Sequence, residues 1–106
     1  MKPILNAFLL TLAFALALST YTFADAGGDT FKAKCAACHG TTGAGDTTMG
    51  KNLKLRDLGS PDVQKQTDDE LTTIITAGKG KMPAYGSRLS KEQISELVKF
   101  IRTLKK

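Results

Sequence analysis

The sequence predicts an all-α domain, and the clearest support comes from the last part of the chain. Apolar residues recur there at the spacing of one helical face: Ile94, Leu97, Val98, Ile101 and Leu104. Two stretches, Thr67–Glu70 and Ser90–Gln93, have the form of capping boxes that begin helices. No stretch alternates apolar and polar residues as a strand does, and the chain has no internal repeats.

The first predicted helix runs from Gly27 to Cys38. Asp25 and Asp29 lie at its amino end, where negative charge favours the helix dipole. Gly40 is placed to end the helix, and a glycine-rich loop follows it.

The middle of the chain is predicted to be extended at first and then helical. Leu53 and Leu55 alternate with charged residues, which indicates an extended segment. Ser60 followed by Pro61 is a typical helix start, and it predicts a short helix from Pro61 to about Gln66.

The next predicted helix begins at Thr67 and ends at Gly78. Its apolar face is formed by Leu71, Ile74 and Ile75. Residues 79–86, rich in glycine and proline, are predicted to be an irregular loop before the last helix begins at Ser90.

Residues 1–24 are predicted to be a secretory signal peptide. A positive start is followed by the apolar run Ile4–Leu18 and a small-residue stretch, so cleavage is expected after Ala24 or Ala26. The run of 15 residues is short for a bilayer span, which needs about 20, although an uncleaved anchor is the alternative. Residues 25–106 are then a single domain exported to the periplasm, without stable membrane insertion.

The charge balance favours protein partners over nucleic acid. The chain has 15 Lys and Arg against 10 Asp and Glu, a net charge of +5, and loss of Lys2 with the signal peptide lowers it by one. An excess of this size suits steering toward an acidic protein surface. It is not clustered enough to indicate nucleic-acid binding.

The run from Cys35 to His39 contains both cysteines and the single histidine of the chain. A C-x-x-C-H run is typical of covalent haem c attachment. On a helix, Cys35, Cys38 and His39 share one face, so two thiols and an imidazole meet the same porphyrin. A redox dithiol would require a βαβ context, and a zinc site would require a second ligand pair that the chain lacks. We therefore expect one covalent haem c, which would also serve as the centre of a small core.

The second axial ligand of the iron is predicted to be Met82. The chain has no second histidine, and beyond Met1 it has only Met49 and Met82. Methionine more often fills gaps in a core than binds metal. However, Met82 lies in a loop bounded by glycine and proline, and Pro83 would hold it in place. Met49 follows His39 by only ten residues, a short path to the opposite haem face, so we assign it to packing or haem-edge cover.

These residues together resemble a class I c-type cytochrome of the small bacterial, single-haem kind. The resemblance covers Gly27 to about Leu104 and depends on C-x-x-C-H, the K-M-P-x-Y-G stretch Lys81–Gly86 and the amphipathic last helix. It implies a cytochrome c fold of three main helices plus a short one around the haem. In that family a glycine and an aromatic residue of the first helix meet an aromatic residue of the last, and the matching positions are Gly27, Phe31 and Phe100.

The resemblance also implies the cofactor contacts. Cys35 and Cys38 would carry the haem covalently, with His39 as proximal and Met82 as distal ligand. The family often has Gly-Pro-Asn-Leu where this chain has Gly50–Leu53, so the carbonyl of Lys51 would have to accept the ring N–H of His39.

The haem propionates need donors other than tryptophan, because the chain has none. Arg56 and Tyr85 are the candidates.

The function predicted from these residues is that of a soluble, monomeric electron carrier and not an enzyme. With histidine and methionine on the iron, one-electron transfer through the haem edge remains. Four lysines could surround that edge and dock an acidic redox partner, or could simply be solvated: Lys51, Lys54, Lys79 and Lys81. The alternatives are a haem enzyme or a gas or redox sensor with a labile methionine ligand, and a membrane-tethered electron-transfer subunit of a larger complex.

Overall fold

The computed structural model describes residues 23–106, so most of the predicted signal peptide lies outside the described residues. The helices follow in order: α2 (Phe23–Lys34), α3 (Ala36–His39), α4 (Thr48–Asn52), α5 (Pro61–Gln64), α6 (Asp68–Ala77) and α7 (Lys91–Thr103). Residues 23–106 contain no strand, only an isolated bridge between Lys79 and Met82. The all-α prediction is confirmed. None of these helices is long and apolar enough to cross a membrane.

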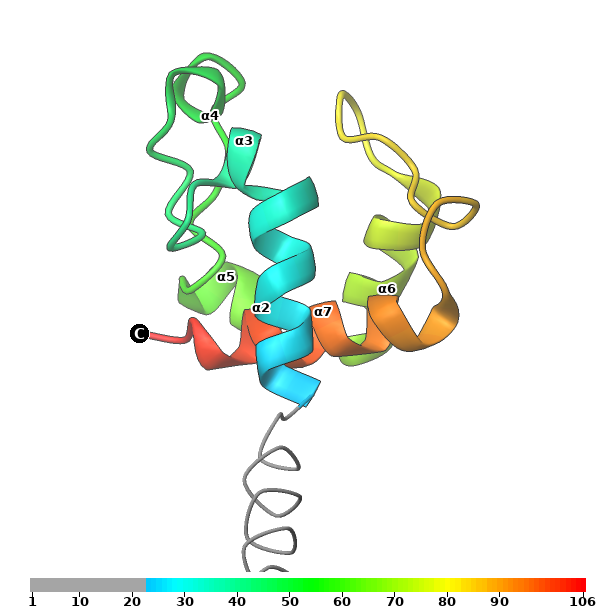
Figure 1. Ribbon diagram of the computed structural model, residues 1–106. Coiled ribbons are helices and arrows are strands. Elements are labelled where there is room, and N and C mark those ends of the chain that lie inside the picture. The colour runs from blue at the N-terminus through cyan, green and yellow to red at the C-terminus, as the bar shows by residue number, and fades with distance from the viewer. Residues whose placement is uncertain (1–22) are drawn as a thin grey trace, which may run out of the picture.

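The helices form a base with two arms (Figure 1). Helix α7 lies across the base, where α2 crosses it and α6 packs against it. Residues 35–58, with α3 and α4, rise on one side and are called the motif arm. Residues 78–86, the yellow loop beyond α6, rise on the other side and are called the methionine arm.

The crossing of α2 and α7 depends on a glycine. A Cβ at Gly27 would collide with the backbone carbonyl of Glu96, so only glycine allows the two helices to approach this closely. One turn later the rings of Phe31 and Phe100 pack with their centroids 5.0 Å apart. The predicted contact between the terminal helices is confirmed.

The hydrophobic core lies along α7 and beneath the cleft between the arms. Leu97 and Phe31 are its most buried large side chains, with 1% and 2% exposed. The apolar face predicted for α6 is confirmed in part, since Leu71 and Ile75 are buried and Ile74 is partly buried. The core therefore closes the base and leaves the cleft open above it.

The first helix differs from the prediction at both ends. It begins at Phe23, before Gly27, and it ends at Lys34, before Cys38. The chain turns at Cys35, and the amide of Cys38 donates to the carbonyl of Cys35 three residues back at 3.2 Å. This tighter turn separates α3 from α2, and Gly40 ends α3 at φ 82° as expected.

The middle segment was wrongly predicted to be extended. Thr47 caps the short helix α4 by accepting from the amide of Gly50 at 2.9 Å. Leu53 ends this helix, and Lys54 then takes a left-handed conformation with φ 56°. The cap also bonds the distant carbonyl of Cys38 at 2.7 Å, a contact that periodicity does not reveal.

The later helix starts follow the prediction. The short helix α5 begins with Pro61 at its first turn and ends two residues earlier than expected. Thr67 accepts from the amide of Glu70 at 3.1 Å, which is one half of a capping box. Ser90 and Gln93 form both halves at the start of α7.

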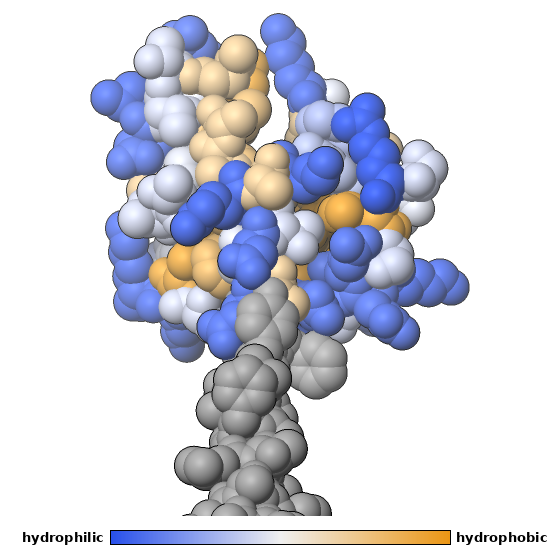
Figure 2. Space-filling view, viewed as in Figure 1, coloured by the Kyte–Doolittle hydropathy of each residue, from blue (hydrophilic) through white to orange (hydrophobic). Residues whose placement is uncertain are grey.

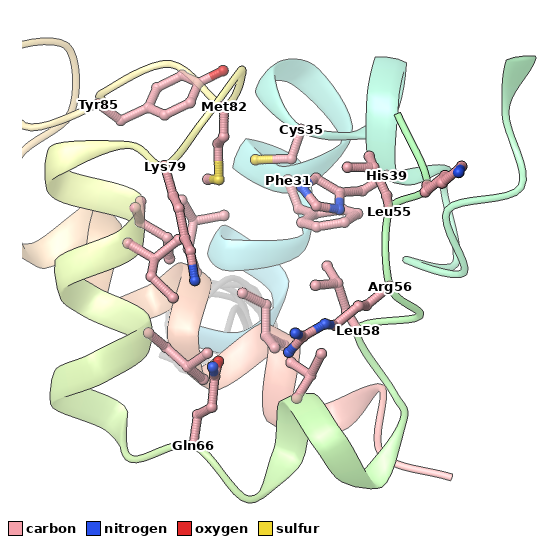
Figure 3. A pocket seen from close by; sticks show the side chains of 17 residues that line it. Phe31, Cys35, His39, Leu55, Arg56, Leu58, Gln66, Lys79, Met82 and Tyr85 are labelled. Carbon is pink, nitrogen blue, oxygen red and sulfur yellow. The ribbon is translucent and has the colours of Figure 1, made fainter. Parts of the chain in front are cut away.

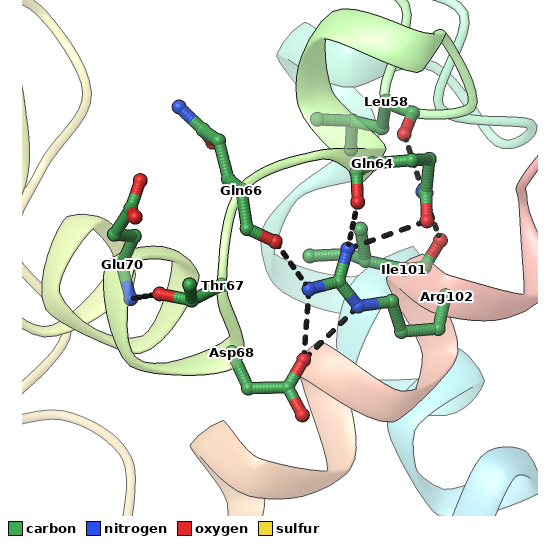
Figure 4. Close-up of polar contacts among 8 residues, drawn as sticks. All are labelled: Leu58, Gln64, Gln66, Thr67, Asp68, Glu70, Ile101 and Arg102. Atoms are coloured by element: carbon green, nitrogen blue, oxygen red, sulfur yellow. Dashed lines mark hydrogen bonds and ion pairs between the residues drawn. The ribbon is translucent and has the colours of Figure 1, made fainter.

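Arg102 joins helices α5, α6 and α7 (Figure 4). From α7 its guanidinium donates to the carbonyl oxygens of Gln64 and Gln66, at 2.9 and 2.6 Å, and forms an ion pair with Asp68 at 2.8 Å. The side chain of Gln64 donates in turn to the carbonyl of Ile101 at 3.0 Å. These bonds fix the connection between α5 and α6 under the cleft.

Candidate haem site

The cleft between the two arms contains two adjoining cavities, an inner one of about 290 Å³ and an outer one of about 570 Å³. Protein cavities of this size hold small-molecule ligands. In the space-filling view the molecule is notched between the arms, with hydrophilic side chains over both (Figure 2). Residues from both arms line both cavities: Cys35, His39, Leu55, Lys79, Met82 and Tyr85. Cys38 lines the outer cavity.

The Cys35–His39 run is held in place by bonds to its carbonyl groups. The carbonyl of His39 accepts from the amide of Gly45 at 2.7 Å, and that of Cys38 accepts from the hydroxyl of Thr47 at 2.7 Å. A Cβ at Gly50 would meet the carbonyls of Gly45 and Cys38, so glycine is required for the arm to fold back on the run. Cys35, Cys38 and His39 consequently reach one cleft.

The partly buried environment of His39 favours the neutral form of its imidazole. Burial lowers the pKa of His39, which favours the form that binds metal. Its Nδ1 atom is buried and has no hydrogen-bond partner among residues 23–106. The carbonyl of Lys51, the expected partner, does not bond Nδ1 here; it accepts from the amide of Lys54 at 3.2 Å.

The two cysteines are free, and they differ in environment. Cys35 packs against the hydrophobic core, and burial raises the pKa of its thiol to about 11. Its sulfur and Met82 both point into the inner cavity, while His39 approaches from the motif arm (Figure 3).

Met82 is held by a tight turn. Its amide donates to the carbonyl of Lys79 at 3.0 Å, and its carbonyl accepts from the amide of Lys79 at 3.3 Å. Gly80 allows the turn with φ 59°. Met82 packs against the core, whereas Met49 is 50% exposed and lines neither cavity, so the expectation that Met49 packs or covers the haem edge is not met.

Tyr85 joins the two sides of the cleft. Its hydroxyl donates to the carbonyl of Lys34 at the end of α2, at 3.0 Å, and burial raises the pKa of Tyr85. Its backbone amide bonds the carbonyl of Ile75 at 3.0 Å. Because the single proton of the hydroxyl is used in the bond to α2, the expectation that Tyr85 donates to a propionate is not supported.

The other predicted cavity residues have mixed outcomes. Leu53 and Leu55 both line the outer cavity, although Leu53 ends α4 and is not extended. Of the four lysines, Lys54 and Lys79 line the inner cavity and Lys81 the outer one, while Lys51 is exposed and lines neither. Gln66, which the sequence did not single out, lines the inner cavity.

Comparison with known proteins agrees with this geometry. Residues 22–101 match the family model of cytochrome c oxidase, cbb3-type, subunit III. Over 78 residues the chain is 40% identical to cytochrome c6 of Leptolyngbya boryana, covering 74% of this chain and 88% of that protein. The chain belongs to the class I c-type cytochromes. It is also 36% identical over 110 residues to cytochrome c6 of Picosynechococcus sp., covering 95% of this chain and 92% of the relative.

A solved structure supports the same family. The KustC0563 c-type cytochrome superposes with a TM-score of 0.70 at 28% identity, covering 76% of this chain and 98% of that one. As a member of this family the cytochrome carries one covalent haem c and is an electron carrier, not an enzyme. The cleft suits that group, since it is largely apolar and is lined by two cysteines, a neutral histidine and a methionine.

Proposed function

We propose that this cytochrome is a soluble, exported, monomeric electron carrier with haem on Cys35 and Cys38 and with His39 and Met82 as axial ligands. The observation that supports the assignment most is that all four side chains line the outer cavity, although Met82 comes from the opposite arm. Histidine and methionine together favour the reduced iron and so raise its potential above that of a bis-histidine haem.

The residues of the cleft are suited to electron transfer and not to substrate chemistry. Met82 is packed against the core and His39 is partly buried, so both would stay close to a bound haem. The bound haem supplies the one-electron couple. The protein supplies two soft or neutral ligands and an apolar lining that limits water at the iron.

A positive rim is proposed as the docking surface for acidic redox partners. Exposed lysines from both arms and from the end of α2 line the cleft: Lys34, Lys54, Lys79 and Lys81. Like charges placed around one opening steer an oppositely charged partner, and this steering weakens as salt is added.

Substitution of the two methionines tests the ligand assignment. In oxidised, haem-loaded protein, Met82→Ala should abolish the weak methionine–iron absorption band and lower the reduction potential. Met49→Ala, at a half-exposed position outside both cavities, is the matched control and should keep the band. The reverse result would refute the choice of Met82.

The mass of the protein purified from its natural host tests export and attachment together. A mass that lacks residues 1–24 or 1–26 and includes one haem supports an exported carrier of residues 25–106 or 27–106. A mass that retains residues 1–24 would contradict release from the membrane, and a mass without haem would contradict attachment.

A further inference from the structure

Gln64 lies behind the lining of the inner cavity and joins three of its walls. From α5, the side-chain amide of Gln64 donates to two backbone carbonyls, that of Leu58 at 2.8 Å and that of Ile101 in α7 at 3.0 Å (Figure 4). Leu58 and Ile101 both line the inner cavity, and so does Val63 on α5. Gln64 itself lines neither the inner nor the outer cavity.

The polar groups of Gln64 are used within the fold. Its side-chain oxygen accepts from Nη1 of Arg102 at 3.4 Å, and its backbone carbonyl accepts from the same guanidinium at 2.9 Å. A neutral amide has two hydrogens to donate, and the carbonyls of Leu58 and Ile101 take one each. Gln64 therefore has no donor left for a ligand, and its side chain holds other segments in place.

Leu58 carries this restraint toward the ligand run. Its amide donates to the carbonyl of Gly43 at 2.9 Å, and a Cβ at Gly43 would come within 3.3 Å of the Leu58 side chain. Two residues further on, the amide of Gly45 donates to the carbonyl of His39 at 2.7 Å. A continuous path of bonds and contacts thus leads from Gln64, through Leu58 and the glycine-rich loop, to His39.

We propose that Gln64 is a positioning residue for the histidine side of the haem. By tying Leu58 to α7, Gln64 fixes both an apolar wall of the inner cavity and the loop that bonds the carbonyl of His39. If the amide were removed, the carbonyl of Leu58 would lose this donor, and a carbonyl without a partner in a partly buried place is costly. The segment around Leu58 would then move toward water. This inference rests on the proposed placement of haem in the cleft.

The reduction potential would register this movement. The oxidised iron carries one more positive charge than the reduced iron, and water stabilises charge better than an apolar lining does. A wall that opens to water therefore favours the oxidised form and lowers the potential. Loss of the bonds from Gln64 should lower the potential although Gln64 lines neither cavity.

The test is Gln64→Leu in the haem-loaded protein, a substitution that nearly keeps the size of the side chain and removes its polar groups. The reduction potential should be lower than in the unsubstituted protein. Hydrogen exchange at the amides of Leu58 and Gly45 should be about fivefold faster, because loss of one net hydrogen bond raises the population of the opened form by about this factor.

Gln93→Leu is the matched control. It removes another neutral amide, one that accepts from the amide of Ser90 at 2.9 Å in the exposed capping box of α7, and Gln93 lines neither cavity. The control should lower stability but leave the potential and the exchange of Leu58 and Gly45 unchanged. If Gln64→Leu does not fold, Gln64→Asn takes its place, since its amide is one methylene too short to reach both carbonyls; it too should lower the potential.

The proposal is overturned if the Gln64 variant loses stability but has the same potential and amide exchange as Gln93→Leu, because Gln64 would then only support the fold. The methionine–iron band is recorded for every protein and should persist in the Gln64 variant, since Met82 lies on the opposite arm. Absence of the band from the unsubstituted protein would refute the proposed ligands. An unchanged potential with the band retained would refute the role of Gln64 alone.

Discussion

The two arms of the cleft are built differently. Short hydrogen bonds hold the motif arm together. Among them, the amide of Gly45 donates to the carbonyl of His39 at 2.7 Å, and the hydroxyl of Thr47 donates to the carbonyl of Cys38 at 2.7 Å. The methionine arm contains the turn Lys79–Met82, which is closed by bonds of 3.0 and 3.3 Å. Beyond that turn the amides of Tyr85 and Gly86 bond α6 at 3.0 Å, and the hydroxyl of Tyr85 reaches α2.

This difference shows where the protein is rigid and where it can open. A segment with many bonds to its own backbone resists local unfolding, whereas a turn with few bonds opens at lower free energy. The histidine side of the haem is thus expected to stay fixed, and the methionine side is expected to open first.

The largest effect is expected from Gly50→Ala in the motif arm. A Cβ there meets the carbonyl oxygens of Gly45 and Cys38, which are backbone atoms and cannot move aside cheaply. We expect a loss of about 3 kcal/mol of stability, measured by chemical denaturation of the haem-loaded protein. Gly80→Ala is the control in the methionine arm, since a Cβ there meets no atom within 4 Å; its φ of 59° should cost about 1 kcal/mol. If the two substitutions lowered the free energy of unfolding equally, the proposed difference in rigidity between the arms would be contradicted.

A smaller effect is expected from Tyr85→Phe. Removal of the hydroxyl deletes the bond to the carbonyl of Lys34 and should cost about 1 kcal/mol. Because the methionine arm then opens more often, added imidazole should bind the oxidised haem faster. Arg88→Gln is the control, as it removes the cation that lies 5.6 Å from the Tyr85 ring centroid and leaves the hydroxyl bond. Unchanged imidazole binding in Tyr85→Phe would show that this bond does not hold the arm.

The smallest effect is expected at the ion pair between Lys106 and Asp57, which ties the chain end to the motif arm at 2.6 Å. The hydrogen bond from Lys106, with that from the amide of Gly59, lowers the pKa of Asp57 in the folded protein. The pair therefore contributes stability above the unfolded pKa of about 4, and this contribution is lost as pH falls through the lower folded value. Lys106→Gln should slightly flatten the decrease in stability below about pH 4, followed by denaturation from pH 2 to pH 7. A steeper decrease would mean that Lys106 does not stabilise the Asp57 carboxylate.

Much of the fold could be predicted because its signals are local. The caps at Thr67 and Ser90 and the apolar spacing of α7 depend on residues within a few positions of one another. The elements that were missed depend on distant partners. Helix α2 includes Gly27, which packs against the carbonyl of Glu96 in α7, and α4 forms where Thr47 also bonds Cys38.

The candidate site divides in the same way. Cys35, Cys38 and His39 form a recognisable motif, and a methionine between glycine and proline narrowed the choice to Met82. Gln66 carries no such signal, because its place in the lining of the inner cavity depends on Arg102 from another helix. Tyr85 was given the wrong role, since nothing in the sequence shows that Lys34 is within its reach.

The bond between Tyr85 and Lys34 also bears on the order of assembly. It joins residues 51 positions apart, whereas the bond from Thr47 to Cys38 spans nine. Closing a longer loop costs more chain entropy, so the shorter contacts are favoured to form earlier during folding. A folding chain can therefore present Cys35 and Cys38 on a partly formed motif arm while the bond from Tyr85 to Lys34 is still open. The Tyr85 bond would then close the cleft only after the motif arm has begun to fold.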